Sequence, residues 1–548
     1  MGKTLLSRID PVSQAERLAA EFDLKEKTLY LCPSPLYGYG ISLLIERLKP
    51  NSAILCVEAD EKLFELSQKT LGGLAESGNV SGRASPFSPA SFALTAETAP
   101  ENLCAFVRKR WGKRFFRRVE VIRLTGGWQL FPQLYENIET TLRREIALEW
   151  GNALTLIRLG RLYSRNLIRN LALLDETGAP DFGSDPILAL GAGPSLDPLL
   201  DEFSRFSGGK IPAPGQRRFK IICVDTCLPA LDERGILPDL VVILESQHWN
   251  IRDFTGLRGR KINAATDLSS LPASIRVLDG KRYFFATIWT ELALLRRLED
   301  AVLLPETYAP LGSVGLSSVA MALRVSSGPV LTGGIDFSFT LDASHARSTP
   351  GHRGLENSSN RFKSFINPAG TFSGGTFPTL SKSGIKVRSN PAMRNYRDLF
   401  EDEFSGNSRL LDIEGSGLNL GLKIVPMQEA FAILEGSSCI SPNKSRMEAG
   451  EHIPLRKEKL SSFVRREIDT LNELKKALSG TGPSTRLEEL LDYADYLWAH
   501  FPENAGAGRQ KPCTDIGFLK RVRVEIEPFL KLWEMTLGEL GTRQASVT

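Results

Sequence analysis

The segment that decides the fold is Ile187-Leu-Ala-Leu-Gly-Ala-Gly-Pro-Ser-Leu-Asp197. Four apolar residues typical of a buried strand are followed at once by a glycine-rich turn, and a helical pattern begins near Leu196. Glycine has no Cβ, so the backbone N–H groups of such a turn can approach a phosphate, and the start of the next helix adds a positive dipole. This order of elements predicts an α/β domain with an anion site at the turn.

The turn departs from the dinucleotide fingerprint G-x-G-x-x-G, because the third glycine is absent and Pro194 stiffens the chain. Gly191 and Gly193 leave room for a phosphate, and Ser195 is placed to cap the helix and to donate to the same ligand. We therefore take Gly191, Gly193, Pro194 and Ser195 as candidate nucleotide-binding residues. A tight structural turn between strand and helix explains the same residues equally well.

Three carboxylates follow apolar, strand-like runs, namely Asp225, Glu245 and Asp336. The carboxyl ends of parallel strands line the ligand crevice of an open sheet, so these side chains are expected at one edge. Asp225 with Thr226, and Glu245, could hold a ribose or sugar hydroxyl. Each acid taken alone could simply cap the next helix. Their number beside a glycine turn favours a binding site.

Gly312 and Ser313 precede a helical pattern that runs to Leu323, which suits a second anion site or close helix packing. His345 lies nine residues after Asp336. Histidine is the usual general acid or base near neutral pH, so His345 and Asp336 are the candidate catalytic residues. A single histidine in a loop is also often only a solvated side chain.

The segment from Ala343 to Arg397 is strongly basic, with nine Lys or Arg and one acid, Glu356. A long irregular segment inside an α/β domain is usually a functional lid or a disordered loop. We predict a basic lid in which Arg347 and Arg353 bind the anionic group of a substrate. A disordered basic loop is the alternative.

The whole chain divides into four predicted segments. Residues 1–130 contain two strand-like runs separated by a helical pattern, and a third run from Val119 to Leu124, which together predict a small Rossmann-like α/β domain. Residues 131–178 predict one long helix, or two with a bend near Gly151 or Gly160. Residues 179–445 form the central α/β domain. Residues 446–548 show only amphipathic helical patterns and predict a helical bundle.

Composition excludes several classes of protein. The 548 residues are 42% hydrophobic and 24% charged, which excludes a mostly disordered chain, a collagen-like chain and a coiled-coil rod. A net charge of +4 does not predict a nucleic-acid-binding protein. No apolar run approaches the roughly 18 residues of a membrane helix, and Asp10 and Pro11 interrupt any signal-like N-terminal run. Seven scattered cysteines without C-x-x-C spacing predict a cytoplasmic location.

Several catalytic motifs are absent from the sequence. No G-x-x-x-x-G-K-[ST] motif occurs, which excludes a P-loop, and neither H-E-x-x-H nor a Cys/His cluster occurs. No Asp-x-Asp directly follows a strand-like run. We therefore expect no bound metal and no metal-dependent sugar-nucleotide site of that type.

Five blocks of the central domain resemble the motility-associated factors, whose central domain is shared with archaeal 6-hydroxymethylpterin diphosphokinase-like proteins. The blocks are Leu190 to Asp197, Val224 to Leu231, Gly235 to Glu245, Gly312 to Gly315, and Gly334 to Thr340 with His345-Ala. They span roughly residues 180–350, and the flanking domains match that family only in layout. The family's layout places an N-terminal α/β domain and a C-terminal helical domain around a sialyltransferase-like core.

The resemblance implies transfer of a nonulosonic acid, of the pseudaminic or legionaminic type, from a CMP-activated donor to Ser or Thr of flagellin, without a metal cofactor. On this reading the glycine turn binds the nucleotide phosphate, Asp225, Thr226 and Glu245 hold the ribose or base, and His345 assists proton transfer. The basic segment pairs with the carboxylate of the sugar. The long basic segment and Phe337-Ser338 after Asp336 leave room for a different sugar or acceptor.

Two other functions are compatible with the same residues. A pterin-type diphosphokinase would use the turn for ATP, and Asp225 and Asp336 for Mg²⁺. A non-enzymatic flagellar chaperone would bind no nucleotide.

Overall fold

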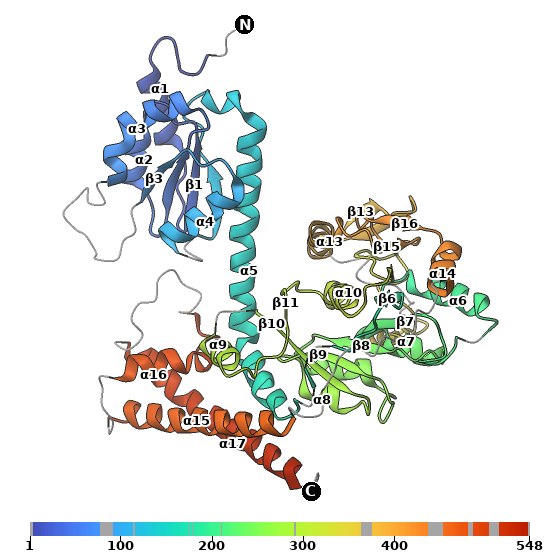
Figure 1. The fold of residues 1–548 in the computed structure, drawn as a ribbon. Coiled ribbons are helices and arrows are strands. Elements are labelled where there is room, and N and C mark those ends of the chain that lie inside the picture. The colour runs from blue at the N-terminus through green and yellow to red at the C-terminus, as the bar shows by residue number, and fades with distance from the viewer. Residues whose placement is uncertain are drawn as a thin grey trace. The chain divides into compact units, whose positions relative to one another are not determined.

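The computed structural model describes residues 4–76, 91–112, 116–174, 176–177, 179–209, 211–289, 292–362, 375–436, 453–480, 486–502 and 515–545 (Figure 1). The chain forms two compact units. The first comprises residues 1–161 and 498–520, and the second residues 162–497 and 521–548. The four segments predicted from the sequence divide the chain more finely, and their boundaries stay a prediction.

The first unit contains a parallel four-stranded sheet in the order β3-β2-β1-β4. Its strands are β1 Thr28–Pro33, β2 Ala53–Val57, β3 Phe92–Thr95 and β4 Arg118–Val121. The surrounding helices are α1 Pro11–Glu21, α2 Ile41–Arg47, α3 Glu61–Glu76, α4 Pro100–Trp111 and the short η1 Gly127–Leu130. Every residue of β1 and β2 is buried, as expected for central parallel strands covered on both faces.

A single helix, α5 Pro132–Leu171, follows the first sheet. The sequence left open one helix or two, and the structure has one that continues through Gly151 and Gly160. Its C-terminal turns belong to the second unit. There Asn166 and Asn170 donate side-chain hydrogen bonds to the backbone carbonyls of Ser246, Ser269, Leu268 and Ser270, at 2.9–3.0 Å. These bonds anchor the end of α5 to the loops that follow β8 and β9.

The second unit contains a ten-stranded sheet whose main path is β11-β10-β9-β8-β7-β6-β12-β15-β16, with β5 beside β10 and all pairings parallel. The strands are β5 Glu176–Thr177, β6 Ile187–Leu190, β7 Lys220–Val224, β8 Leu240–Ile243, β9 Ala264–Asp267, β10 Arg282–Thr287, β11 Thr307–Tyr308, β12 Val330–Gly333, β15 Leu410–Ile413 and β16 Lys423–Val425. The α/β class with parallel sheets, predicted from the sequence, is confirmed.

The strand order reverses between β6 and β12. From β6 the chain builds outward through β7, β8, β9, β10 and β11, and then returns to place β12 on the other side of β6. In open parallel sheets the carboxyl ends of the strands at such a reversal are the usual ligand position. The glycine turn after β6 and Asp336 after β12 both lie at this point.

Helices cover this sheet. They are α6 Leu196–Phe206, α7 Leu228–Glu233, α8 Pro272–Arg276, α9 Ala293–Asp300, α10 Val314–Val325, α11 Pro350–Ser358, α13 Pro391–Phe404 and α14 Met427–Gly436, with the 3₁₀ turns η2 Asp225–Cys227 and η3 His248–Phe254. Helix α10 packs against β6, β7, β8 and β12 through a buried face that includes Leu316 and Val319. Because α10 leads into the parallel strand β12, it runs against the strands, and its N-terminus lies at their carboxyl edge.

The described residues of the C-terminal region are helical, as predicted. They form α15 Ile453–Leu478, α16 Leu487–Tyr493, η5 Asp495–Leu497 and α17 Ile516–Ala545. In the second unit the fully buried Glu467 of α15 accepts two hydrogen bonds from Arg297 of α9, at 3.0 and 3.1 Å, and one each from Tyr493 and Tyr496. This buried network joins α15, α16 and η5 to α9.

The basic segment from Ala343 to Arg397 is not a simple irregular lid. Its described part contains α11, the antiparallel hairpin β13 Phe377–Leu380 and β14 Lys386–Ser389, and the start of α13. Of its nine basic residues, Lys363 lies outside the described residues. The expectation of an irregular segment is therefore wrong. The segment is rich in Gly, Ser and Thr, but Pro350 and Pro391 begin helices, and the residues on either side of Gly384 form a hairpin.

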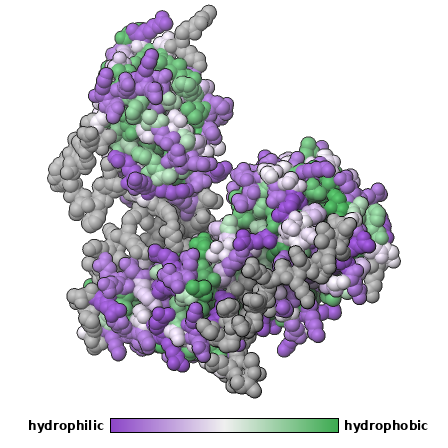
Figure 2. Space-filling view, in the orientation of Figure 1, coloured by the Kyte–Doolittle hydropathy of each residue, from purple (hydrophilic) through white to green (hydrophobic). Residues whose placement is uncertain are grey.

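None of the helices in the described ranges combines the length and the apolar character needed to cross a membrane. On the face that Figure 2 displays, hydrophilic and hydrophobic residues are interspersed.

Candidate functional site

The turn after β6 is fastened to the segment after β12. Gly191 N–H donates to the carbonyl of Gly333 and Gly193 N–H to that of Gly334, each at 2.8 Å. Ser195 donates its N–H to Asp336 Oδ2 at 2.8 Å and its hydroxyl to Asp336 Oδ1 at 2.5 Å. The three N–H groups that a phosphate would need are thus engaged within the chain. The Asp336 carboxylate occupies the anion position at the start of α6.

The position of Asp336 also explains why two nearby residues are glycine. A Cβ on Gly193 would lie 2.5 Å from Asp336 Oδ2, and a Cβ on Gly417 would lie 2.8 Å from Asp336 Oδ1. Real Cβ atoms do not approach other atoms so closely, so both positions require glycine while Asp336 keeps its place. Burial raises the pKa of Asp336, while the hydrogen bonds from Ser195 and the charge of Lys382 act in the opposite direction.

A buried ion pair that sequence reasoning missed lies beside this turn. Lys382, in the turn of the β13–β14 hairpin, places its Nζ 2.6 Å from Oδ1 of Asp412 in β15, and the two side chains are 3% and 2% exposed. Thr332 of β12 donates to the same Oδ1 at 3.2 Å. Asp412 Oδ2 is buried without a hydrogen-bond partner among the described residues. An acid inside the apolar run Leu410-Leu-Asp-Ile is a feature from which a buried charge at Asp412 could have been predicted. Nothing in the sequence distinguishes Lys382 from the other eight basic residues of its segment.

The carboxyl ends of β7 and β8 carry a second polar cluster. Asp225 is buried and accepts hydrogen bonds from Asn250 Nδ2 at 2.7 Å and from Thr226 N–H at 2.9 Å, and the same Asn250 nitrogen lies 3.1 Å from Asp253. Burial raises the pKa of Asp225 to about 6 and that of Asp253 to about 7. Glu245 is exposed, and its Oε1 accepts the N–H of Gln247 at 2.8 Å. The sequence identified Asp225, Thr226 and Glu245 but missed Asn250 and Asp253, which both lie in the short η3 turn.

Gly312 and Ser313 form the entrance to α10. Gly312 has a φ of +70°, and the Ser313 side chain makes no capping hydrogen bond. A Cβ on Gly315 would lie 3.7 Å from Ile335, the residue before Asp336, which places this helix start next to the β12 loop. The first N–H groups of a helix have no partner within the helix. The start of α10 is therefore an anion-attracting position at the carboxyl edge of the sheet.

His345 lies beside the glycine turn. The N–H of the next residue, Ala346, donates to the carbonyl of Ala192 at 2.9 Å. The imidazole Nδ1 is 3.2 Å from the hydroxyl of Ser344, and burial lowers the pKa of His345 below its ordinary value. This lowered pKa favours the neutral imidazole, the protonation state that a general base requires.

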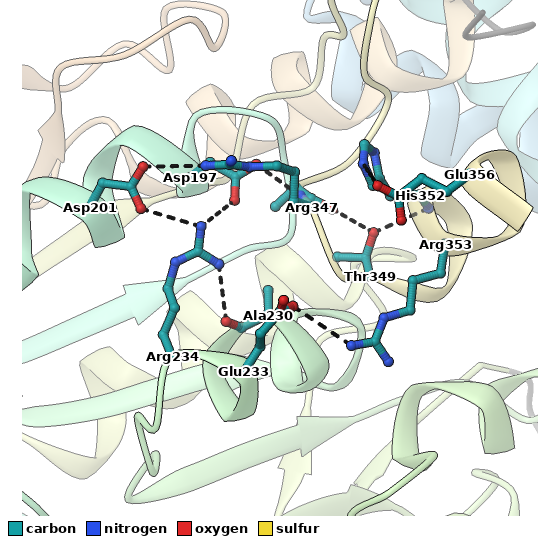
Figure 3. A network of polar contacts seen from close by, with 11 residues as sticks. Asp197, Asp201, Ala230, Glu233, Arg234, Arg347, Thr349, His352, Arg353 and Glu356 are labelled. Atoms are coloured by element: carbon teal, nitrogen blue, oxygen red, sulfur yellow. Dashed lines mark hydrogen bonds and ion pairs between the residues drawn. The ribbon is translucent and has the colours of Figure 1, made fainter. Parts of the chain in front are cut away.

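Arg347 and Arg353 face carboxylates (Figure 3). Arg347 donates its backbone N–H to Asp197 at 2.8 Å and places Nη2 3.3 Å from Asp201, and both acids also pair with Arg234. Arg353 Nη2 lies 3.7 Å from Glu233. Arg347 thus links the loop before α11 to α6, and Arg353 links α11 to α7. Their assignment to a substrate anion stays a prediction.

Within the described ranges, no three His, Cys, Asp or Glu side chains gather closely enough to hold a metal ion.

Comparison with known proteins identifies the central region. Residues 165–342 match the family model of the 6-hydroxymethylpterin diphosphokinase MptE-like proteins. The chain carries an MptE-like domain. This domain contains the glycine turn, Asp225, Glu245, the start of α10 and Asp336. His345, Arg347, Arg353 and the Lys382–Asp412 pair lie beyond its last matched residue.

Two full-length similarities extend beyond the MptE-like domain. An uncharacterized protein of Treponema pallidum (strain Nichols) is 28% identical over 545 residues, which cover 94% of this chain and 90% of the relative. The structure is similar to that of the MAf glycosyltransferase from Magnetospirillum magneticum AMB-1 over 99% of this chain and 83% of that chain, with a TM-score of 0.50 and 14% sequence identity. The second similarity shows a shared fold around the MptE-like domain.

Proposed function

We propose that this protein is a glycosyltransferase that moves a nonulosonic acid from a CMP-activated donor to Ser or Thr of flagellin or a similar protein acceptor. The observation that carries this proposal is the fold shared with the MAf glycosyltransferase over almost the entire chain. The reversal of the strand order between β6 and β12 supports it, because open parallel sheets bind ligands at such a point. We place the activity in the cytoplasm, which the buried free thiols of Cys223 and Cys227 support.

In this proposal the donor phosphate binds at the start of α10 and not on the turn after β6. The N–H groups of Gly191, Gly193 and Ser195 already have acceptors. By contrast, the hydroxyl of Ser313, the N-cap residue of α10, makes no capping hydrogen bond. Asp225, held by hydrogen bonds from Thr226 and Asn250, then accepts hydrogen bonds from the ribose hydroxyls, and Glu245 lies exposed at the next strand end. Asp336 acts as a positioning residue that holds the turn in place.

His345 is the proposed general base. Its neutral imidazole takes the proton of the acceptor hydroxyl while the hydroxyl oxygen forms a bond to the anomeric carbon of the sugar. The bond between that carbon and the phosphate oxygen breaks, and CMP leaves with the bonding electrons. The dipole of α10 and the donors at its start stabilise the charge that develops on the phosphate. No metal is assigned a role in this reaction.

A diphosphokinase that uses ATP and Mg²⁺ is the second candidate, and the description of the matching family favours it. This diphosphokinase would bind ATP at the same carboxyl edge of the central sheet, with Asp225 and Asp336 near the metal.

Titration of the full chain with CMP and with ATP, each with Mg²⁺ and with EDTA, separates the two candidates. We expect CMP to bind equally well in both conditions and ATP to bind more weakly. Binding of ATP that depends on Mg²⁺, without binding of CMP, would replace the glycosyltransferase with the diphosphokinase. Formation of glycosylated flagellin peptide from a CMP-nonulosonic acid, detected by mass spectrometry, is the direct assay. A chain that binds neither nucleotide and transfers no sugar would leave a non-enzymatic role.

A further inference from the structure

The four-stranded sheet of the first unit has a switch point of its own. The chain builds outward from β1 through β2 to β3, and then crosses to place β4 on the other side of β1. The carboxyl ends of β1 and β4 therefore flank the position where open parallel sheets bind ligands. Pro33 ends β1 and Val121 ends β4.

A hollow lies at this position. It has a volume of about 270 Å³, and its lining includes Pro33, Val121, Arg123, Trp128, Glu136 and Glu139. The strand ends, the loop after β4, η1 and the first turns of α5 thus contribute to one cavity. Small-molecule sites begin at about 300 Å³. The hollow therefore suits one compact ligand and is too small for a dinucleotide.

The side chains around the hollow combine an aromatic ring with carboxylates. The guanidinium carbon of Arg123 lies 4.8 Å from the ring centroid of Trp128, and its Nη2 lies 3.7 Å from Glu139. The side chain of the exposed Glu136 makes no hydrogen bond or ion pair with any residue that the structure describes. A planar ring can take the place of the Arg123 guanidinium against Trp128, and Glu136 can accept hydrogen bonds from hydroxyl or amino groups.

The surroundings of the hollow disfavour a phosphate. Its lining has two carboxylates against one guanidinium, and that guanidinium already faces Glu139. At the end of β2, the buried Glu58 adds a third acid close by, which Ser34 Oγ contacts at 2.7 Å and Tyr135 at 3.5 Å. The Ser34 N–H after β1 donates to the Val57 carbonyl at 2.8 Å, so it is not available to an anion.

We propose that this hollow binds a nucleoside that carries no phosphate. Its base would stack on Trp128, and its ribose hydroxyls or exocyclic amino group would donate to Glu136. A base has the planar face that the indole prefers, and an uncharged ribose avoids the repulsion that a phosphate would meet. This site is separate from the nucleotide site proposed for the second unit and does not depend on it.

The test is a calorimetric titration of the full chain with adenosine, guanosine, cytidine and uridine, and with their 5′-monophosphates. We expect at least one nucleoside to bind and Trp128→Ala to weaken it roughly 5- to 150-fold, the range for loss of one base–aromatic stack. The monophosphate of that nucleoside should bind the Trp128-dependent site about tenfold more weakly or worse. Trp249→Ala is the matched control, because Trp249 is an exposed tryptophan of the second unit that also lies under an arginine, Arg252, at 4.4 Å.

A second variant does not depend on the packing of Trp128. Glu136→Lys should raise the affinity for the monophosphate relative to its nucleoside, whereas Glu65→Lys, at an exposed glutamate of α3, should not. The proposal is overturned if no nucleoside binds, if Trp128→Ala binds nucleosides as tightly as the parent chain, or if Glu136→Lys leaves the ratio unchanged. Loss of CMP binding in variants of the second unit would not affect this result, so the two sites are tested separately.

Discussion

Ser195 and Asp336 are 141 residues apart in the sequence, and two hydrogen bonds of 2.8 and 2.5 Å join them at the reversal of the strand order. The bonds link the start of α6 to the loop after β12, so one carboxylate holds these two segments together. This carboxylate takes the place that a phosphate would occupy at the turn. In the proposed function the nucleotide phosphate therefore binds elsewhere at this edge, at the neighbouring start of α10.

The proposed phosphate position predicts opposite effects on stability and on binding. Ser313→Asp should keep or raise the melting temperature, because Asp is a good N-cap, and should weaken CMP binding at least about tenfold through charge repulsion. Cytidine, which has no phosphate, should bind the central site almost unchanged. Thermal unfolding and calorimetry measure the two effects.

The control for Ser313→Asp is Asn390→Asp at the N-cap of α13, where the side chain already accepts the N–H of Met393 at 2.9 Å. It should raise stability slightly without an effect on CMP. Unchanged CMP affinity in Ser313→Asp would remove the phosphate from the start of α10.

The general base assignment predicts that His345→Ala lowers kcat about 10²- to 10⁴-fold with little change in CMP affinity. Because burial lowers the pKa of His345, activity should rise with pH through a value below the ordinary 6.5 and then level off. His248→Ala, at an exposed histidine, is the control. Normal turnover of His345→Ala would exclude this role.

The Lys382–Asp412 pair predicts strong coupling. Lys382→Met leaves the Asp412 charge buried and should cost about 3–5 kcal/mol in the free energy of unfolding. The double variant Lys382→Met/Asp412→Asn should recover most of this loss, since neither charge is then unpaired. Urea unfolding of the parent chain, Lys382→Met, Asp412→Asn and the double variant gives the coupling energy. The exposed Lys386→Met on the same hairpin should change stability little, and purely additive effects of the two substitutions would contradict the buried pair.

The raised pKa of Asp225 predicts a pH dependence of stability. Between the unfolded value near 3.8 and the folded value of about 6, the unfolded chain has lost a proton that the folded chain retains. The free energy of unfolding therefore falls by about 3 kcal/mol for this group as pH rises through this window. Above the window the contribution of Asp225 is constant. Asp225→Asn should flatten this part of the profile in urea unfolding from pH 4 to 8, whereas the exposed Asp342→Asn should not.

The ion pairs of Arg347 and Arg353 allow a direct test of their role. If they bind the carboxylate of the donor sugar, Arg347→Gln/Arg353→Gln should weaken the CMP-sugar but not CMP, and should reduce the salt dependence of donor binding. Stability should change by only about 1 kcal/mol or less for Arg347, whose side chain is 59% exposed. Equal donor affinity across a salt series would leave both arginines as links to the acids of α6 and α7.

The sequence alone determined the parallel α/β architecture and the position of the central turn. Runs such as Ile187 to Leu190 are apolar throughout because parallel strands are buried on both faces, and that pattern is visible without coordinates. The carboxylates Asp225 and Asp336 could be placed at the strand ends for the same reason. Local chemistry also predicted the C-terminal helices and a helical connection at α5, although it left open whether that connection is one helix or two.

Only the tertiary structure decided which groups meet. The partner of Ser195 lies 141 residues away, and the partner of Lys382 lies 30 residues away on another element, so no local pattern connects them. The order in which strands join the sheet placed β12 beside β6, and this order made an internal carboxylate, rather than a ligand, the acceptor for the turn. Sequence spacing indicates what a residue can donate or accept. The long-range pairing of strands determines whether that capacity is still free when the chain has folded.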